Sequence, residues 1–372
     1  MRIKLLPVLM ASLTSMSVAA DVLSNPQIGV VLDGRFEEGD GFSLGHTELS
    51  MSANIDDKFH GVLTSVIETH DDDTEFLLEE AFIETIALPN GFNVRAGRFL
   101  SNFGYMNNQH MHTDNFTTRP GIYRDYLGTH YYDDGLRASI VLPTDLYIRL
   151  SAEAFSGDKM SALEHAEDQN SVGVYTAAMK MGGDISESSS WQFGLSYLHN
   201  KNGTADHFEE SDHSHDGHDH SHDARKTGKH LYGTDFVWKW APDGNYKYRN
   251  LTLAAEYMLL DGVVDNKFKD EDHAPDKLSG YYLSGVYRFS PSWSAGIRYG
   301  EVETYDGHAH GDHVHFTDQK EKEATAMVAW NSSHFGTIRA QFSRTEDQDK
   351  EKDNVFMLQY VMSFGAHGAH AF

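Results

Sequence analysis

Apolar and polar side chains alternate at every second position through much of this chain, and this pattern restricts its fold more than any other feature. From Trp293 to Tyr299, apolar side chains occupy the odd positions, while serine, glycine and arginine occupy the even ones. Successive side chains of a β-strand point to opposite faces of a sheet, so the alternation predicts strands. No segment shows a sustained 3.6-residue stripe, and the sequence therefore predicts an all-β fold.

The connections between the predicted strands distinguish a membrane barrel from a soluble β-sandwich. Aromatic residues often end the apolar face, as in strands that cross a membrane between two aromatic girdles. Short connections such as 290–292 alternate with long polar ones such as 100–130. Eight external connections, six of them long, and seven short turns predict a transmembrane antiparallel β-barrel of sixteen strands, with short periplasmic turns and long external loops. The strands are expected to begin near residues 28, 42, 59, 75, 92, 131, 145, 171, 190, 231, 247, 278, 293, 323, 336 and 354.

The first twenty residues read as a targeting segment. Arg2 and Lys4 precede a mostly apolar run from Leu5 to Val18, and small residues follow up to Ala20. This arrangement predicts a secretory signal peptide at residues 1–20 and a single barrel domain at residues 21–372. A buried N-terminal helix is the alternative interpretation.

Composition excludes several classes of protein. The 372 residues contain no cysteine, which excludes disulfide scaffolds, cysteine metal sites and thiol catalysis. The formal net charge of -26 speaks against a nucleic-acid partner, because binding phosphates needs a basic face. The chain also lacks the GxSxG, HExxH and GxxxxGK[ST] motifs, so we expect no enzyme.

Histidine is concentrated in two of the predicted external loops, at about 200–230 and 304–322. Imidazole nitrogen is a good ligand for zinc, copper and nickel, and histidines at i and i+2 of an extended segment point the same way. The alternative is a pair of solvated loops whose histidines hold no ion. We expect Zn²⁺ as the transported or loop-bound ion, with no cofactor required. The candidate metal ligands are His207, His213, His215, His218, His220, His222, His308, His310, His313 and His315.

Two segments resemble a known family. Leu78–Glu84, a turn, and then Arg95–Gly104 are similar to paired strands of porins of the phosphate-selective O/P type. The resemblance implies a sixteen-stranded channel whose third external loop, here residues 100–130, folds inward. The histidine content departs from that family's pattern. The histidine-rich loops instead resemble those of outer-membrane zinc-acquisition proteins.

Charges of both signs fall on the predicted inward face. An arginine-lined constriction would favour anions, whereas acidic, histidine-rich loops would favour cations at the mouth. The same charges would also serve merely to solvate a water-filled interior. Lys180, Lys239, Glu153, Asp235 and Glu256 share this inward face. The candidate pore-lining residues are Arg95, Arg137, Arg149, Arg288, Arg298, Arg339, Glu80 and Glu84.

These observations lead to a hypothesis with two alternatives. The first is an outer-membrane channel of a Gram-negative bacterium whose loops capture divalent metal, chiefly zinc, for passive uptake. The second is a general or anion-selective, phosphate-type porin whose histidine loops are incidental or adhesive. The third is a structural or adhesion barrel without an open pore. Expected partners are outer-membrane lipid, divalent metal ions or small solutes, the barrel-assembly machinery through the strand at 355–364, and two further copies in a homotrimer.

Overall fold

The computed structural model describes residues 26–70, 73–162, 171–208, 227–310 and 313–366. The predicted signal peptide at 1–20 lies outside the described residues. So do five of the candidate metal ligands, namely His213, His215, His218, His220 and His222.

One sheet contains all the strands of the described residues. The strands are β1 Gln27–Glu37, β2 Gly41–Leu44, β3 Thr47–Asn54, β4 Phe59–His70, β5 Asp73–Thr85, β6 Phe92–Leu100, β7 Tyr132–Val141, β8 Tyr147–Phe155 and β9 Val174–Ser186. They continue with β10 Ser189–Asn200, β11 His230–Trp240, β12 Asn250–Asp261, β13 Lys277–Ser290, β14 Trp293–His310, β15 His313–Ser333, β16 Gly336–Glu346 and β17 Lys352–Gly365. The helical elements are α1 Gly121–Leu127 and the short 3-10 turns η1 Pro89–Gly91, η2 Met111–Thr113, η3 Asp158–Met160, η5 Pro242–Gly244 and η6 Asn266–Phe268.

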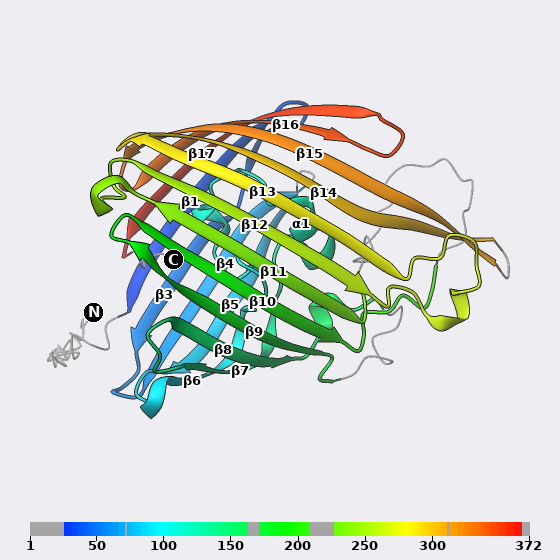
Figure 1. Cartoon of the computed structure of the whole chain (residues 1–372), viewed down its shortest axis with the longest axis horizontal. Helices are drawn as coiled ribbons and strands as arrows, with labels where there is room; N and C mark the ends of the chain where they lie inside the picture. Colours follow the sequence, from blue (N-terminus) through cyan, green and yellow to red (C-terminus); the bar gives the residue numbers. More distant parts are fainter. Residues whose placement is uncertain (1–25, 71–72, 163–170, 209–226, 311–312, 367–372) are drawn as a thin grey trace, which may run out of the picture.

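The strands form a closed antiparallel meander (Figure 1). Consecutive strands pair with one another, and β17 returns to pair with β1 from Gly29↔Gly365 to Glu37↔Met357. Both β2 and β3 pair with β1, so they are two parts of one barrel strand that is interrupted at Gly45 and His46. The seventeen segments therefore make sixteen barrel strands, which confirms the predicted fold class. Closure pairs both edges of the sheet along the body of the barrel.

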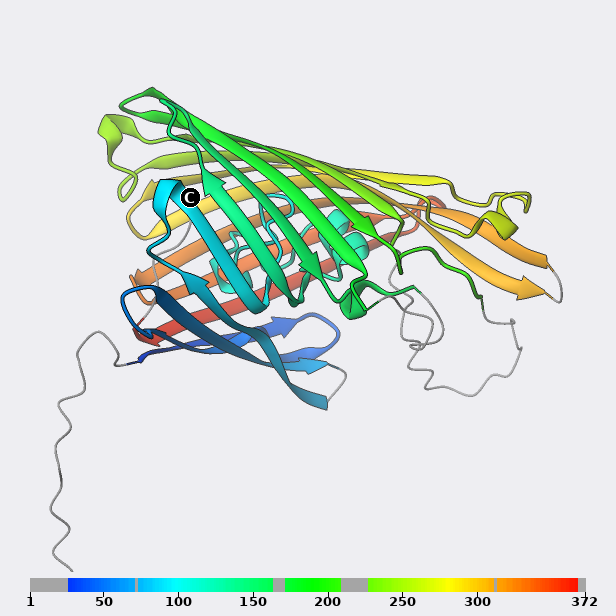
Figure 2. The same cartoon turned by 90° about the horizontal axis from the view of Figure 1, so that it is seen from below.

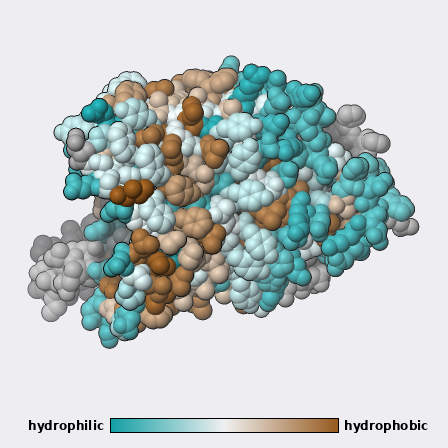
Figure 3. Space-filling view, in the orientation of Figure 1, coloured by the Kyte–Doolittle hydropathy of each residue, from teal (hydrophilic) through white to brown (hydrophobic). Residues whose placement is uncertain are grey.

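The outer surface of the barrel carries an apolar band. Ile297 is 69% exposed on this face, whereas its neighbour Arg298 points inward and is buried. Trp293 and Trp330 lie directly opposite each other near a short turn, with ring centroids 6.4 Å apart. Figure 3 shows apolar residues gathered over the half of the barrel near the termini and hydrophilic residues at the opposite end. Across the described ranges, no helix is long and apolar enough to cross a membrane.

The segment predicted as an external loop at 304–322 is a β-hairpin instead. The strands β14 and β15 continue to His310 and His313 and extend well beyond their neighbours (Figure 2). On one face of the hairpin, Val314 and Phe316 are buried, and Phe316 packs against Phe208 from another external connection. This apolar contact explains why a segment rich in histidine and aspartate is regular in structure.

The connection between β6 and β7, residues 101–131, lies inside the barrel rather than above it (Figure 2). It carries η2 and α1, and its side chains Phe103, Ile122, Tyr123 and Tyr126 are buried in the main apolar core. The inward-folded third loop that the family resemblance implied is therefore present.

Candidate functional site

The chain enters the barrel interior at the end of β6. The buried carboxylate of Glu153 on β8 accepts hydrogen bonds from Ser101 Oγ at 2.5 Å and from the Asn102 main-chain nitrogen at 3.0 Å. Gly104 follows with a φ of +64°, and a Cβ there would lie 2.4 Å from the Tyr123 hydroxyl. Only glycine fits such a conformation and approach without strain. The end of the Arg95–Gly104 motif is therefore the bend that turns the loop inward.

Arginines of the barrel wall hold the loop by its main chain. Arg298 Nη1 donates to the Thr118 carbonyl oxygen at 2.5 Å, and Arg339 Nη2 donates to that of Asp114 at 2.6 Å. Arg137 donates to the carbonyl oxygen of Leu100. Each guanidinium is buried, and Arg298 and Arg137 also pair with Glu323 and Glu153. These three predicted pore-lining residues do face inward, but their contacts make them anchors of the loop.

The other candidate pore-lining arginines lie nearer the short turns and are partly exposed. Arg95 pairs with Glu84 at 2.8 Å and stacks over the ring of Phe82. Arg149 reaches Ser139 Oγ at 3.5 Å, and Arg288 donates to the Pro291 carbonyl oxygen at 3.0 Å. Among the described residues, neither Arg149 nor Arg288 has a carboxylate partner within ion-pair distance.

Two pairs of like charges face each other across neighbouring strands of this region. The register places Arg95 opposite Arg137 on β6 and β7, and Arg149 opposite Lys180 on β8 and β9. Directly opposed like charges destabilise a sheet unless counter-charges or solvent intervene. Lys180 is matched by Asp235 at 2.5 Å. The inner wall of β6–β9 is thus built around cations, and Arg149 is the one left without a counter-ion among the described residues.

A group of histidines and glutamates joins the loop to the wall at β3–β5, and we call it the histidine–glutamate cluster. Glu79 and Glu80 follow one another yet both are buried, because Thr64 pairs with Glu80 and Ser65 pairs with Leu78. Glu79 is therefore the extra residue of a β-bulge, which turns two consecutive side chains inward. The cluster comprises His46, Glu48, Glu68, Glu79, Glu80, His110, His112 and His130.

Glu79 is the centre of this cluster. Its Oε1 lies 3.1 Å from His46 Nε2 and 2.8 Å from His130 Nε2, while its Oε2 lies 3.1 Å from His110 Nδ1. Burial alone would lower the pKa of His110, but the carboxylates of Glu48, Glu79 and Glu80 outweigh burial and raise that pKa well above its usual range. Burial lowers the pKa of His130, although Glu79 acts in the opposite direction.

Of this cluster, sequence reasoning named only Glu80 as a candidate site residue, and it named Glu80 as pore-lining. His110, His112 and His130 belong to the 100–130 loop, but they are dispersed in the sequence and less conspicuous than the two histidine tracts. The bulge at Glu79 breaks the period-two alternation, so counting alternate positions assigns Glu79 and Glu80 to opposite faces. An adjacent pair of acidic residues inside the otherwise apolar run from Phe76 to Ile83 was the available signal.

The histidines of the long hairpin share one exposed face. His308 lies opposite His315, and His310 lies opposite His313. His313 Nδ1 is 3.3 Å from Glu271 Oε1, and a cavity of about 300 Å³ is lined by Asp270, Glu271 and Asp272 together with three of these histidines. The structure thus brings four candidate metal ligands together, while His207 lies exposed in a different external connection.

Fold and site together define the class of protein. A closed sixteen-stranded barrel with a lipid-facing apolar band and a third loop folded into the lumen has the architecture of an outer-membrane porin, a class of channel. The chain belongs to the family of phosphate-selective porins O and P, whose profile matches residues 36–360. The predicted outer-membrane location is thereby confirmed.

Relatives and solved structures agree with this assignment. An uncharacterized protein of Aquifex aeolicus (strain VF5) is 27% identical over 355 residues, which cover 91% of this chain and 72% of the relative. Pseudomonas putida OprB at high pH superposes with a TM-score of 0.63 at 12% identity and covers 91% of this chain and 94% of its own. An anion-selective porin from Comamonas acidovorans superposes with a TM-score of 0.55 at 11% identity, and the match covers 92% of this chain and 100% of that porin. The trimer form of Vibrio cholerae OmpT superposes with a TM-score of 0.52 at 9% identity, and the match covers 91% of this chain and 98% of OmpT. At these identities the structural matches show the fold alone.

Proposed function

We propose that this porin is a diffusion channel selective for small anions, with inorganic phosphate as its leading candidate solute. The observation that most supports this proposal is the cationic wall of β6–β9. In that wall, Arg149 faces the lumen without a carboxylate partner among the described residues. Guanidinium groups bind phosphate oxygens through paired, charge-assisted hydrogen bonds. This is the second of the hypotheses drawn from the sequence, and membership of the phosphate-selective family supports it.

The acidic residues of the lumen do not offset this cationic wall. Glu48, Glu79 and Glu80 are at most 5% exposed and face histidines of the loop, so a permeating solute does not meet their charge. Glu153 and Glu323 are likewise buried against Arg137 and Arg298. Glu84 is partly exposed but is paired with Arg95, whereas Arg149 and Arg288 in the same half of the lumen have no carboxylate partner among the described residues, which favours anions.

Ion selectivity in planar bilayers tests this proposal directly. In a KCl gradient, the sign of the reversal potential is expected to show that the refolded channel conducts chloride better than potassium. Added phosphate is expected to reduce chloride conductance in a saturable way. Arg149→Gln is expected to weaken phosphate block about fivefold, as for one charge-assisted contact of about 1 kcal/mol in a hydrated site. Arg344→Gln, an exposed arginine on β16, is the matched control.

Cation preference together with insensitivity to phosphate would contradict the proposal. A barrel that folds but gives no conductance would favour the structural or adhesion alternative. Folding of each variant is checked by its heat-dependent shift in electrophoretic mobility before recordings are compared.

A second function is favoured by one specific observation. The hairpin places the histidine pairs His308–His315 and His310–His313 on a single face beside the acidic segment Asp270–Asp272. We propose that this face binds Zn²⁺ at the external mouth, as an accessory to the pore. Changing these four histidines to asparagine should then abolish zinc block of conductance. Unchanged zinc block in the folded variant would reject the hairpin as the binding site.

The channel is proposed to assemble as a homotrimer, as the trimer form of OmpT does. Its closing strand β17 presents Tyr360 and Phe364 on the lipid-facing side, which suits recognition by the barrel-assembly machinery. Native mass spectrometry of the detergent-solubilised protein distinguishes three copies from one.

A further inference from the structure

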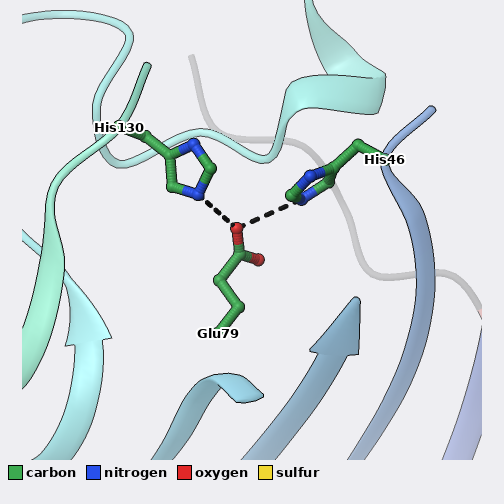
Figure 4. A group of neighbouring side chains, drawn as sticks. All are labelled: His46, Glu79 and His130. Carbon is green, nitrogen blue, oxygen red and sulfur yellow. Dashed lines mark ion pairs between the residues drawn. The ribbon is translucent and has the colours of Figure 1, made fainter. Parts of the chain in front are cut away.

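Three side chains of the histidine–glutamate cluster converge on one point. His46 comes from the interruption between β2 and β3, Glu79 from the bulge in β5, and His130 from the end of the inward loop. Figure 4 shows both imidazole rings directed at the same oxygen of Glu79. The donor atoms of the three residues all lie within 4.8 Å of one another.

The spacing of these atoms matches that of ligands around a small ion. Glu79 Oε1 lies 3.1 Å from His46 Nε2 and 2.8 Å from His130 Nε2. Zinc ligands at about 2.0–2.1 Å from a tetrahedral centre stand roughly 3.3 Å apart. Both distances from Glu79 are within about half an ångström of this separation, and the nitrogen atoms of His46 and His130 lie within 4.8 Å of each other.

Several polar atoms here are buried without a hydrogen-bond partner. These atoms are His46 Nε2, Glu79 Oε2 and His130 Nδ1. His46 and Glu79 are each only 2% exposed. Buried polar atoms are almost always paired, so the orphaned His46 Nε2, which points to the centre of the group, needs a partner. A metal ion would supply that partner.

The outer contacts of His46 have the form that metal-binding histidines require. Its Nδ1 is held by the carboxylate of Glu68. A carboxylate on Nδ1 fixes the ring in the tautomer that leaves Nε2 free for a metal ion, and it increases the basicity of that nitrogen. The opposite nitrogen is therefore directed at Glu79 and prepared to act as a ligand.

We propose that His46, Glu79 and His130 form a binding site for a divalent transition metal, with zinc as the best fit, that fastens the inward loop to the barrel wall. Two imidazoles and one carboxylate are a donor set typical of zinc, whereas calcium and magnesium prefer oxygen ligands. His130 belongs to the loop, and His46 and Glu79 belong to the wall, so a shared ion crosslinks the two.

A cavity adjoins the three ligand side chains and leaves room for a further ligand. This cavity of about 700 Å³ is lined by His46, Glu79 and His130 and also by Arg35 and Lys159. Because Glu37, Asp40 and Glu68 line the same cavity, its charges are of both signs, and a water molecule is the simplest further ligand. The neighbouring group Glu48, Glu79 and His110 shares Glu79 and would need that carboxylate to bridge to a second ion. The site proposed here is independent of the anion selectivity and of the external hairpin.

Zinc titration of the refolded full chain tests the proposal, provided that the histidines of the two external tracts can no longer bind zinc. The background variant therefore carries asparagine in place of the ten histidines of the two tracts. Competition with a chromophoric chelator is expected to reveal one zinc ion per chain. His130→Asn and Glu79→Gln are expected to weaken its binding at least 100-fold, because each removes a direct ligand. His60→Asn, a histidine that contacts Asn54 in β3, should leave zinc affinity unchanged.

X-ray absorption at the zinc edge gives a readout that does not depend on the variants. The background chain is expected to show two imidazole ligands with oxygen donors and no sulfur. Absence of stoichiometric zinc binding in that chain would overturn the proposal, and so would an absorption spectrum without imidazole. Binding that survives both His130→Asn and Glu79→Gln in folded protein would overturn it as well. These results leave the selectivity measurements of the channel unaffected, so failure of one proposal is distinguishable from failure of the other.

Discussion

Arg298 of the barrel wall donates a hydrogen bond of 2.5 Å to the carbonyl oxygen of Thr118, a residue of the loop 180 positions earlier in the chain. The same guanidinium pairs with Glu323 on the neighbouring strand. One buried cation thereby connects two adjacent strands and the loop that crosses the lumen. The cross-section of the pore depends on contacts of this kind.

Replacing this anchor should widen the channel and destabilise the protein. Arg298→Ala removes the hydrogen bond to Thr118 and leaves the buried Glu323 with Arg124 as its remaining ion-pair partner and Thr325 as a hydrogen-bond donor. Loss of one member of a buried pair costs about 3–5 kcal/mol. We expect a larger and noisier single-channel conductance and a free energy of unfolding lower by about 3 kcal/mol, measured by urea titration in lipid vesicles.

The matched control is Arg344→Ala, which removes an exposed arginine from β16. It should change neither conductance nor stability measurably. Equal conductance of the Arg298→Ala channel and the unmodified channel would show that Arg298 does not hold the loop.

The loss of stability caused by an arginine substitution on the lipid-facing side should depend on the depth of that position in the membrane. Ile297 lies about 13 Å along β14 from the girdle residue Trp293, whereas Ile338 lies opposite Trp330 at the girdle itself. Ile297→Arg is expected to cost about 2–4 kcal/mol and Ile338→Arg about 0–1 kcal/mol. Folding titrations in vesicles measure both, and equal costs would show that the apolar band is misplaced.

The fold was largely predictable because the lipid imposes period-two alternation on every strand. The notable error is β15, expected to begin near 323 and observed from His313. One face of its first ten residues is polar. On the other face, Phe316 packs against apolar residues of distant connections, including Phe208. Such a partner is invisible to a pattern that is read along a single segment.

The sequence predicted which side chains of the candidate site point inward, but it did not predict which of them are buried. Alternation places Arg149 and Arg298 on the same inner face, yet only the path of the loop shows that Arg298 is covered and Arg149 is not. The bulge at Glu79 likewise arises from pairing with β4, a relation between strands that spacing within β5 does not encode.

The extended hairpin should depend on its buried aromatic side chain. Phe316 is 1% exposed and packs against Phe208 and Tyr305. Truncation of a buried phenylalanine costs about 3–5 kcal/mol, so Phe316→Ala is expected to speed amide hydrogen exchange at 304–310 and 313–316 by about 100-fold or more. Exchange in β10–β12 should stay the same.

His315→Ala, on the exposed face of the same strand, is the control and should leave exchange unchanged. Slow exchange that persists in Phe316→Ala would mean that main-chain pairing alone maintains the hairpin.

The most direct test of the account compares the lumen with the histidine tracts as the source of selectivity. The measurement is the reversal potential in a KCl gradient for three proteins: the unmodified channel, Arg149→Glu, and a chain whose ten tract histidines are asparagine. If the lumen sets selectivity, the first and third proteins prefer anions and the preference of Arg149→Glu shifts toward cations. An unchanged reversal potential in Arg149→Glu, with the preference lost in the tract-free chain, would contradict it.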